Sequence, residues 1–144
     1  MLLFLFRALS SIALLVLVSG CANKQAVVYD EYGPVKYDEW AESYQDKAFY
    51  GRNLVSVNQF SASLFLANES ETKHLHKNHD LYLVLLKGKA TVHLYENAFE
   101  LKPGDSIYIR RSAPHWIEQV GNETAVFNII TSLIPWDNDQ IELD

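Results

Sequence analysis

The chain from Leu54 onward is a succession of short apolar stretches separated by turn-forming residues. These stretches are rich in β-branched residues, aromatic residues and leucine, which is typical of β-strands. They read LVSVNQF, SASLFLA, LYLVLLKG, ATVHLY, AFEL, SIYIRR, HWIEQV and TAVFNIITSLI. Segments between them, such as Lys102-Pro103-Gly104-Asp105, favour turns. About eight strands without helical patterns between them predict an all-β fold, an antiparallel sandwich or barrel.

The first twenty residues differ in character from the rest of the chain. They read MLLFLFRALSSIALLVLVSG and contain one charged residue, Arg7. Such a stretch is either a secretory signal or an N-terminal membrane span. The tetrapeptide Val18-Ser19-Gly20-Cys21 resembles the lipobox of bacterial lipoproteins, which implies cleavage before Cys21 and a diacylglyceryl group on its sulfur. In the alternative, the segment remains an uncleaved anchor and Cys21 has no special role.

Cys21 is the only cysteine, so a lipidated chain has no thiol left for a disulfide and must rely on its core. The formal net charge of −6 argues against nucleic acid as a partner and against electrostatic binding to anionic membranes. The expected partner is therefore the lipid bilayer, contacted through acyl chains on Cys21. The lipobox resemblance implies a lipid-anchored protein of the bacterial cell envelope, and Ala22, rather than aspartate, after the cysteine resembles the pattern of export to the outer membrane. In a cell with two membranes it would lie at the outer membrane, facing the periplasm.

We divide the chain into a signal peptide at 1–20, a linker or packing segment at 21–50 and a β-domain at 51–144. In the second segment, Gly33-Pro34 interrupts regular structure, and residues 38–47 are compatible with one or two helical turns. This segment is rich in tyrosine. Its aromatic residues are predicted to pack on the outside of the following sheet, with stacking against a ligand as the alternative.

Three of the five histidines lie within six positions, at 74, 76 and 79. His74 and His76 are two residues apart, which places both side chains on one face of a strand. Two imidazoles so placed can bind one ion, because neutral imidazole nitrogen suits Zn, Fe, Cu, Ni and, less tightly, Mn. His115 follows a predicted turn and begins its own strand. It is the natural third ligand from a distant part of the sequence.

These two segments resemble the paired motifs of the cupin family, small β-barrels of the jelly-roll type. The first family motif is His-x-His, an acidic residue, an apolar strand and glycine, and the chain has HLHKNHDLYLVLLKG, which ends at Gly88. The second motif is Pro-Gly-Asp, a strand, a turn and histidine, and the chain has PGDSIYIRRSAPH, which ends at His115. The resemblance covers roughly residues 54–130 and implies a single jelly-roll barrel with a divalent metal inside.

The acidic position of the first motif is not matched cleanly. Counted back from Gly88 it falls on Leu81, which cannot bind a metal, whereas counted forward from His76 it falls on Asp80. Asp80 is the predicted fourth ligand, provided that it faces inward. His79 is the alternative, because adjacent strand residues face opposite ways.

Three functions are compatible with these features. The first is a lipid-anchored protein that binds a divalent transition metal (Zn, Fe, Mn or Ni), a small molecule, or both inside its barrel. The second is a metal-dependent enzyme of the dioxygenase or isomerase type, although the sequence assigns no catalytic residue. The third is a metal-free structural or interaction lipoprotein, since the family includes barrels that have lost the metal. A homodimer formed through edge strands is a further expectation.

Overall fold

The structure, a computed structural model, describes residues 26–132 and 139–144. The predicted signal peptide at 1–20 and the predicted lipidation site Cys21 lie outside the described residues. Within the described ranges, no helix is both long and apolar enough to cross a membrane.

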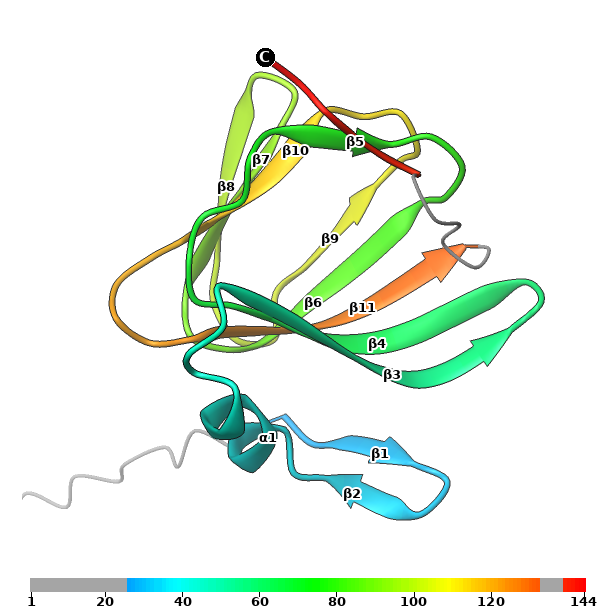
Figure 1. Ribbon diagram of the computed structural model, residues 1–144, viewed down its shortest axis with the longest axis vertical. Coiled ribbons are helices and arrows are strands. Elements are labelled where there is room, and N and C mark those ends of the chain that lie inside the picture. Colours follow the sequence, from blue (N-terminus) through cyan, green and yellow to red (C-terminus); the bar gives the residue numbers. More distant parts are fainter. Residues whose placement is uncertain (1–25, 133–138) are drawn as a thin grey trace, which may run out of the picture.

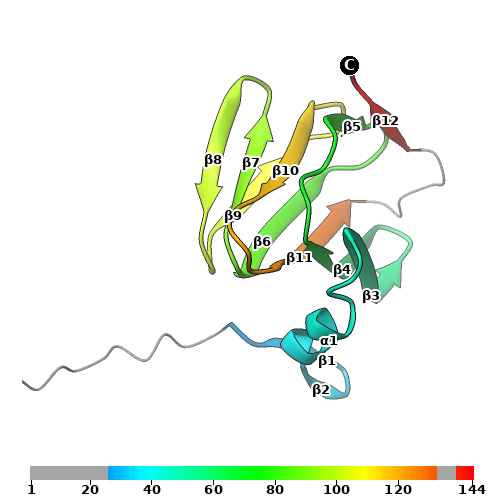
Figure 2. The ribbon, with the colours of Figure 1, turned by 60° about the vertical axis from the view of Figure 1, so that its left-hand side comes forward.

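Two five-stranded antiparallel sheets face each other and form the body of the domain (Figure 1). The first sheet contains, in spatial order, β3 (Phe49–Val57), β4 (Phe60–Ala67), β11 (Ala125–Ser132), β6 (Leu81–Lys87) and β9 (Ser106–Ile109). The second sheet contains β12 (Gln140–Glu142), β5 (His74–His76), β10 (His115–Gln119), β7 (Ala90–Leu94) and β8 (Asn97–Leu101). Figure 2 shows β7, β8 and β10 of the second sheet side by side. This double-stranded β-helix confirms the predicted all-β jelly-roll architecture.

Strand boundaries differ from the predicted ones at the start of the first sheet. The run LVSVNQF is not one strand, because residues 58–59 form the turn between β3 and β4. Asparagine at the first turn position explains the break, since its side chain favours tight turns between paired strands. Strand β3 in turn begins at Phe49, five residues before the apolar run.

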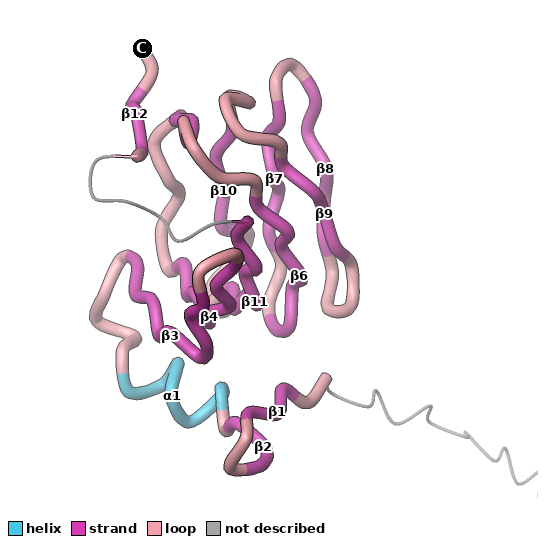
Figure 3. The backbone as a smooth tube through the Cα atoms, turned by 90° about the vertical axis from the view of Figure 1, so that its right-hand side faces the viewer, coloured by secondary structure: helices cyan, strands magenta, loops and turns pink. Residues whose placement is uncertain are grey.

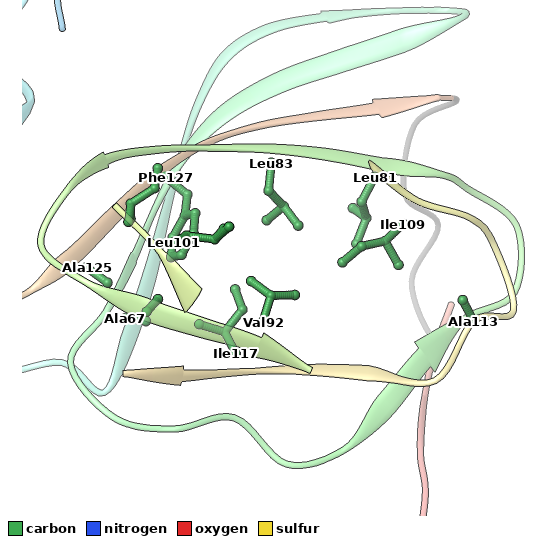
Figure 4. Close-up of a cluster of buried hydrophobic side chains, with 12 residues drawn as sticks. Ala67, Leu81, Leu83, Val92, Leu101, Ile109, Ala113, Ile117, Ala125 and Phe127 are labelled. Atoms are coloured by element: carbon green, nitrogen blue, oxygen red, sulfur yellow. The ribbon is translucent and has the colours of Figure 1, made fainter. Parts of the chain in front are cut away.

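The main core lies between the two sheets. Along β6, Leu81, Leu83 and Leu85 are buried, whereas the intervening Tyr82 is 42% exposed, as expected for a strand with one face inward. Figure 4 shows Leu83 pointing toward Val92 of the opposite sheet, with Leu81 beside Ile109. This alternation sets which residues of the neighbouring loops point into the barrel.

A second apolar cluster lies on the outer face of the first sheet, where the N-terminal segment packs. The hairpin of β1 (Val28–Asp30) and β2 (Gly33–Val35) precedes α1 (Tyr37–Ser43), and both lie beside β3 and β4 in Figure 3. Tyr37 and Trp40 are buried in this cluster against Leu64 and Val126. The aromatic residues of α1 therefore pack on the outside of the sheet as predicted, whereas Tyr32 in the hairpin turn is 90% exposed.

Gly88 forms the tight turn after β6, as the first motif implied. Its φ of +79° lies in the left-handed region, and a Cβ built there would lie 2.6 Å from the carbonyl oxygen of Thr124. Any side chain at this position would disturb the contact between the β6–β7 turn and the start of β11.

Candidate metal centre

The structure brings His74, His76 and His115 together inside one end of the barrel. Strands β5 and β10 are neighbours in the second sheet, and His115 lies directly opposite His74 in their register. One ring nitrogen from each of the three residues lies within 4.8 Å of the others. The ring centroids are 4.4 Å apart for His74 and His115 and 5.1 Å apart for His74 and His76. The predicted meeting of imidazoles from two distant segments is therefore confirmed as geometry.

Backbone carbonyls fix two of these rings. Nδ1 of His74 donates to the carbonyl oxygen of Thr72, and Nδ1 of His115 donates to that of Ala113, both at 2.8 Å. Because a carbonyl can only accept, each Nδ1 carries the proton and each Nε2 keeps its lone pair. Metal-binding histidines commonly have this arrangement, in which the second nitrogen is held by a carbonyl or carboxylate.

Burial keeps the imidazoles of His76 and His115 neutral at neutral pH. Burial, together with the neighbouring rings of His79, His115 and His74, lowers the pKa of His76 to about 3. Burial also lowers the pKa of His115 to about 4, against the opposing effect of its hydrogen bond to Ala113. Neutral imidazole is the form that binds a metal, so these rings need not lose a proton first.

Asp80 lies apart from this cluster. Its Oδ1 accepts hydrogen bonds from the backbone nitrogen (2.8 Å) and from Nε (3.1 Å) of Arg111, and its Oδ2 accepts from Nη2 of Arg111 (3.1 Å) and from the hydroxyl of Ser132 (3.3 Å). These contacts hold the pKa of the carboxyl well below its usual range. The prediction of Asp80 as fourth ligand required an inward-facing side chain. Asp80 instead has the outward orientation of Tyr82, because the inward positions on this stretch belong to His79, Leu81 and Leu83.

His79, the predicted alternative to Asp80, is buried and points inward. Its Nδ1 lies 2.6 Å from Oδ2 of Asp139, a buried carboxylate that immediately precedes β12. One ring nitrogen of His76 and of His79 and one oxygen of Asp139 lie within 4.8 Å of one another. The site region therefore holds a second group of potential ligands, which shares His76 with the first.

Two acidic residues near the histidines escaped the sequence analysis. Asp139 belongs to an acidic tail with no motif, and its position depends on the pairing of β12 with β5, which sequence alone does not reveal. Glu71 lies in the turn composition NESET, yet its Oε2 accepts a hydrogen bond from the backbone nitrogen of Ile117 at 2.9 Å. Burial raises the pKa of Glu71, while nearby His74 opposes the rise. Its position three residues before the His-x-His motif is the only sequence signal that could have indicated it.

A cavity of about 600 Å³ opens beside the histidines. Its apolar wall includes Phe65, Leu83 and Ile129, and its polar wall includes Glu71 and Thr131. This size and mixed lining are typical of a pocket for a small organic molecule.

His93 is the one histidine that the structure places elsewhere. Its ring stacks on Trp116 with centroids 4.1 Å apart, and its Nε2 lies 2.9 Å from Oε2 of Glu118. Because it lies in neither ligand group, His93 provides a control position for experiments on the site.

The chain forms a double-stranded β-helix with a histidine cluster at one end, and residues 64–132 match the family described as Cupin domain. An uncharacterized conserved protein with a double-stranded β-helix domain from Klebsiella pneumoniae superposes with a TM-score of 0.58 at 16% identity, over 69% of this chain and 87% of that chain. That likeness shows the fold alone.

Two curated relatives extend the comparison without adding a function, since both are uncharacterized proteins. The protein from Aquifex aeolicus is 30% identical over 76 residues, which cover 53% of this chain and 60% of the relative. The protein from Methanocaldococcus jannaschii is 39% identical over 49 residues, which cover 34% of this chain and 39% of the relative. The match therefore spans less than two thirds of either relative.

Proposed function

We propose that this protein is a lipid-anchored cupin-type barrel that binds one divalent transition metal through His74, His76 and His115 and admits a small molecule to the adjacent cavity. The single observation that carries the metal proposal is the hydrogen bonding of the buried His74 and His115 rings. His74 and His115 each use Nδ1 for a backbone carbonyl, so each has Nε2 left as a ligand beside His76. An all-nitrogen donor set suits Zn, Fe and Ni, and Mn less tightly.

A bound ion would supply Lewis acidity or redox chemistry at this end of the cavity. The chain's own residues would determine what enters: Phe65 and Ile129 present apolar surface, while Thr131 and Glu71 offer hydrogen-bonding groups. A ligand with an apolar body and one or two polar groups fits this lining.

Elemental analysis of the full chain, purified in detergent, tests the metal proposal. The wild type is expected to retain stoichiometric metal, and His76→Ala and His115→Gln are expected to carry less metal per chain than the wild type. His93→Gln serves as the matched control and should retain the full metal content, because His93 lies outside both ligand groups. If all four proteins carry the same metal content, or none carries any while the variants match the wild type in stability, the metal-free barrel is the better description.

A second candidate, a metal-dependent enzyme of the dioxygenase or isomerase type, is favoured by Glu71. This carboxyl lines the same cavity, and burial raises its pKa, as is common for groups that transfer protons. Oxygen consumption and isomer formation, measured with a panel of phenols, thiols and sugars, separate an enzyme from a binding protein. Turnover that is lost in Glu71→Gln while metal content is retained would favour the enzyme.

The membrane anchor rests on the sequence of residues 1–21. Radiolabelled palmitate should be incorporated into the wild-type protein in bacterial cells and not into Cys21→Ala. Separation of the two membranes by density should then place the labelled protein in the outer membrane. Equal labelling of the two proteins would remove the lipoprotein proposal without affecting the metal centre.

A further inference from the structure

Three buried polar atoms near the histidine triad have no hydrogen-bond partner. They are Nδ1 of His76, Nδ1 of His79 and Oδ2 of Asp139. His79 and Asp139 are both 3% exposed in their side chains. Buried polar groups in proteins are rarely left unpaired, so three such atoms facing one another require an explanation.

The three atoms converge on one point between β5, the loop after it and the start of β12. Oδ2 of Asp139 lies 2.6 Å from Nδ1 of His79 and 3.7 Å from Nδ1 of His76. The shorter contact has the distance of an ion pair, and Asp139 opposes the lowering of the pKa of His79 by burial, but the contact does not meet the angular criteria of a hydrogen bond. All three residues offer ligand atoms within 4.8 Å of one another.

Asp139 is held in this orientation by the surrounding backbone. Its Oδ1 accepts a hydrogen bond from the backbone nitrogen of Asn78 at 2.8 Å, and its carbonyl oxygen accepts one from Lys77 at 3.1 Å. The next residue, Gln140, lies opposite His76 in the pairing of β12 with β5. The carboxylate is therefore fixed with one oxygen satisfied and the other directed at the two imidazoles.

A divalent cation satisfies all three atoms at once. Zinc binds imidazole nitrogen and carboxylate oxygen at about 2.0–2.2 Å, so two of its ligand atoms are normally about 3–3.5 Å apart. The observed separations of 2.6 and 3.7 Å lie on either side of that range and need only small adjustments. A buried carboxylate is also costly without a positive partner, and the cation would supply the charge.

We propose that His76, His79 and Asp139 form a second divalent-metal site, adjacent to the histidine triad and sharing His76 with it. The chain then binds two ions, and His76 belongs to both ligand groups. The sharing of His76 rests on the triad site proposed above, whereas the ligands His79 and Asp139 do not.

Equilibrium binding of Zn²⁺ to the full chain in detergent, measured by dialysis and elemental analysis after chelator treatment, tests this proposal. The wild type is expected to bind two Zn²⁺ per chain, and Asp139→Asn and His79→Gln to bind one. Glu142→Gln is the matched control, because Glu142 is an exposed acid of the same strand β12 and should leave the count at two.

The variants also separate failure of this site from failure of the triad site. His115→Gln should bind one Zn²⁺ through the second site, and that ion should be lost when Asp139→Asn is added. If Asp139→Asn and His79→Gln bind as many ions as the wild type, the second site is refuted. A single ion that is lost in both Asp139→Asn and His115→Gln would instead indicate one mixed centre and overturn the two-ion proposal. A single ion that survives in His115→Gln but not in Asp139→Asn would support the second site and refute the triad.

Discussion

Acidification should unfold the metal-free protein, and the buried histidines determine the pH at which this begins. In the folded chain the pKa values of His76 and His115 are lowered to about 3 and about 4, and burial also lowers that of His79. In the unfolded chain each imidazole returns to a pKa of about 6.5. The unfolded state therefore binds more protons than the folded state between these values, so stability is fully present above about pH 6.5 and is lost as the pH falls below it.

The size of the effect follows from the gap between pH and the unfolded pKa. Each histidine whose folded pKa is 4 or lower reduces the free energy of unfolding by about 2 kcal/mol at pH 5 relative to pH 7.5. His76 and His115 together approach about 4 kcal/mol, and His79 adds to this. A domain of this size is typically stable by about 5–15 kcal/mol, so the loss is a large part of the total.

Urea unfolding in the presence of a chelator, at several pH values from 7.5 to 5.0, measures this loss. The range stops at pH 5 because below it the carboxyls, Asp80 among them, begin to contribute. Burial raises the pKa of Glu71, so that residue acts in the opposite direction near the lower limit. His115→Gln should reduce the slope of unfolding free energy against pH, because one of the titrating rings is gone. A free energy that stays constant or rises from pH 7.5 to 5.0 would refute the reasoning.

Further predictions concern residues that position the site. Asp80→Ala should destabilise the chain by about 1–3 kcal/mol in urea unfolding, because it removes the ionic hydrogen bonds to Arg111, and metal content should not change; lost metal would restore Asp80 as a ligand. Gly88→Ala should lower stability by at least about 1 kcal/mol, because φ is +79° and the new Cβ meets a backbone oxygen; an unchanged melting temperature would contradict this. Leu83→Ala, at 2% exposure, should cost about 2–5 kcal/mol, whereas Tyr82→Ala on the outer face of β6 should cost less; equal losses would contradict the assigned strand faces.

The sequence predicted the parts of this molecule that depend on local pattern. Apolar runs and turn residues indicated the strands, and the His-x-His spacing indicated that His74 and His76 share a face. His115 was the expected third ligand because it begins a strand of its own, and the resemblance supported its meeting with the pair, since no local pattern shows that β10 lies beside β5. The order of the two motifs thus indicated which distant segments lie side by side, which the alternation of apolar residues cannot show.

Asp80 and Asp139 show where this reasoning ends. Asp80 has the spacing of a ligand, but which face of the strand enters the barrel is decided by the core positions Leu81 and Leu83. Asp139 has no motif spacing. It is placed by the short strand β12, which pairs with β5 although the two strands lie more than sixty residues apart in the sequence. The outward orientation of Asp80 could have been inferred from the alternation of buried and exposed residues along β6. The pairing of β12 with β5, which places Asp139, could not have been inferred from the sequence.

The pairing of β12 with β5 also has a consequence for the order of events during synthesis. His76 emerges from the ribosome long before Asp139, and the strand that carries His115 emerges between them. The three histidines of the triad therefore come together only after the strand that carries His115 has been made and has paired with β5. Asp139 can join His76 and His79 only later, when β12 pairs with the other side of β5.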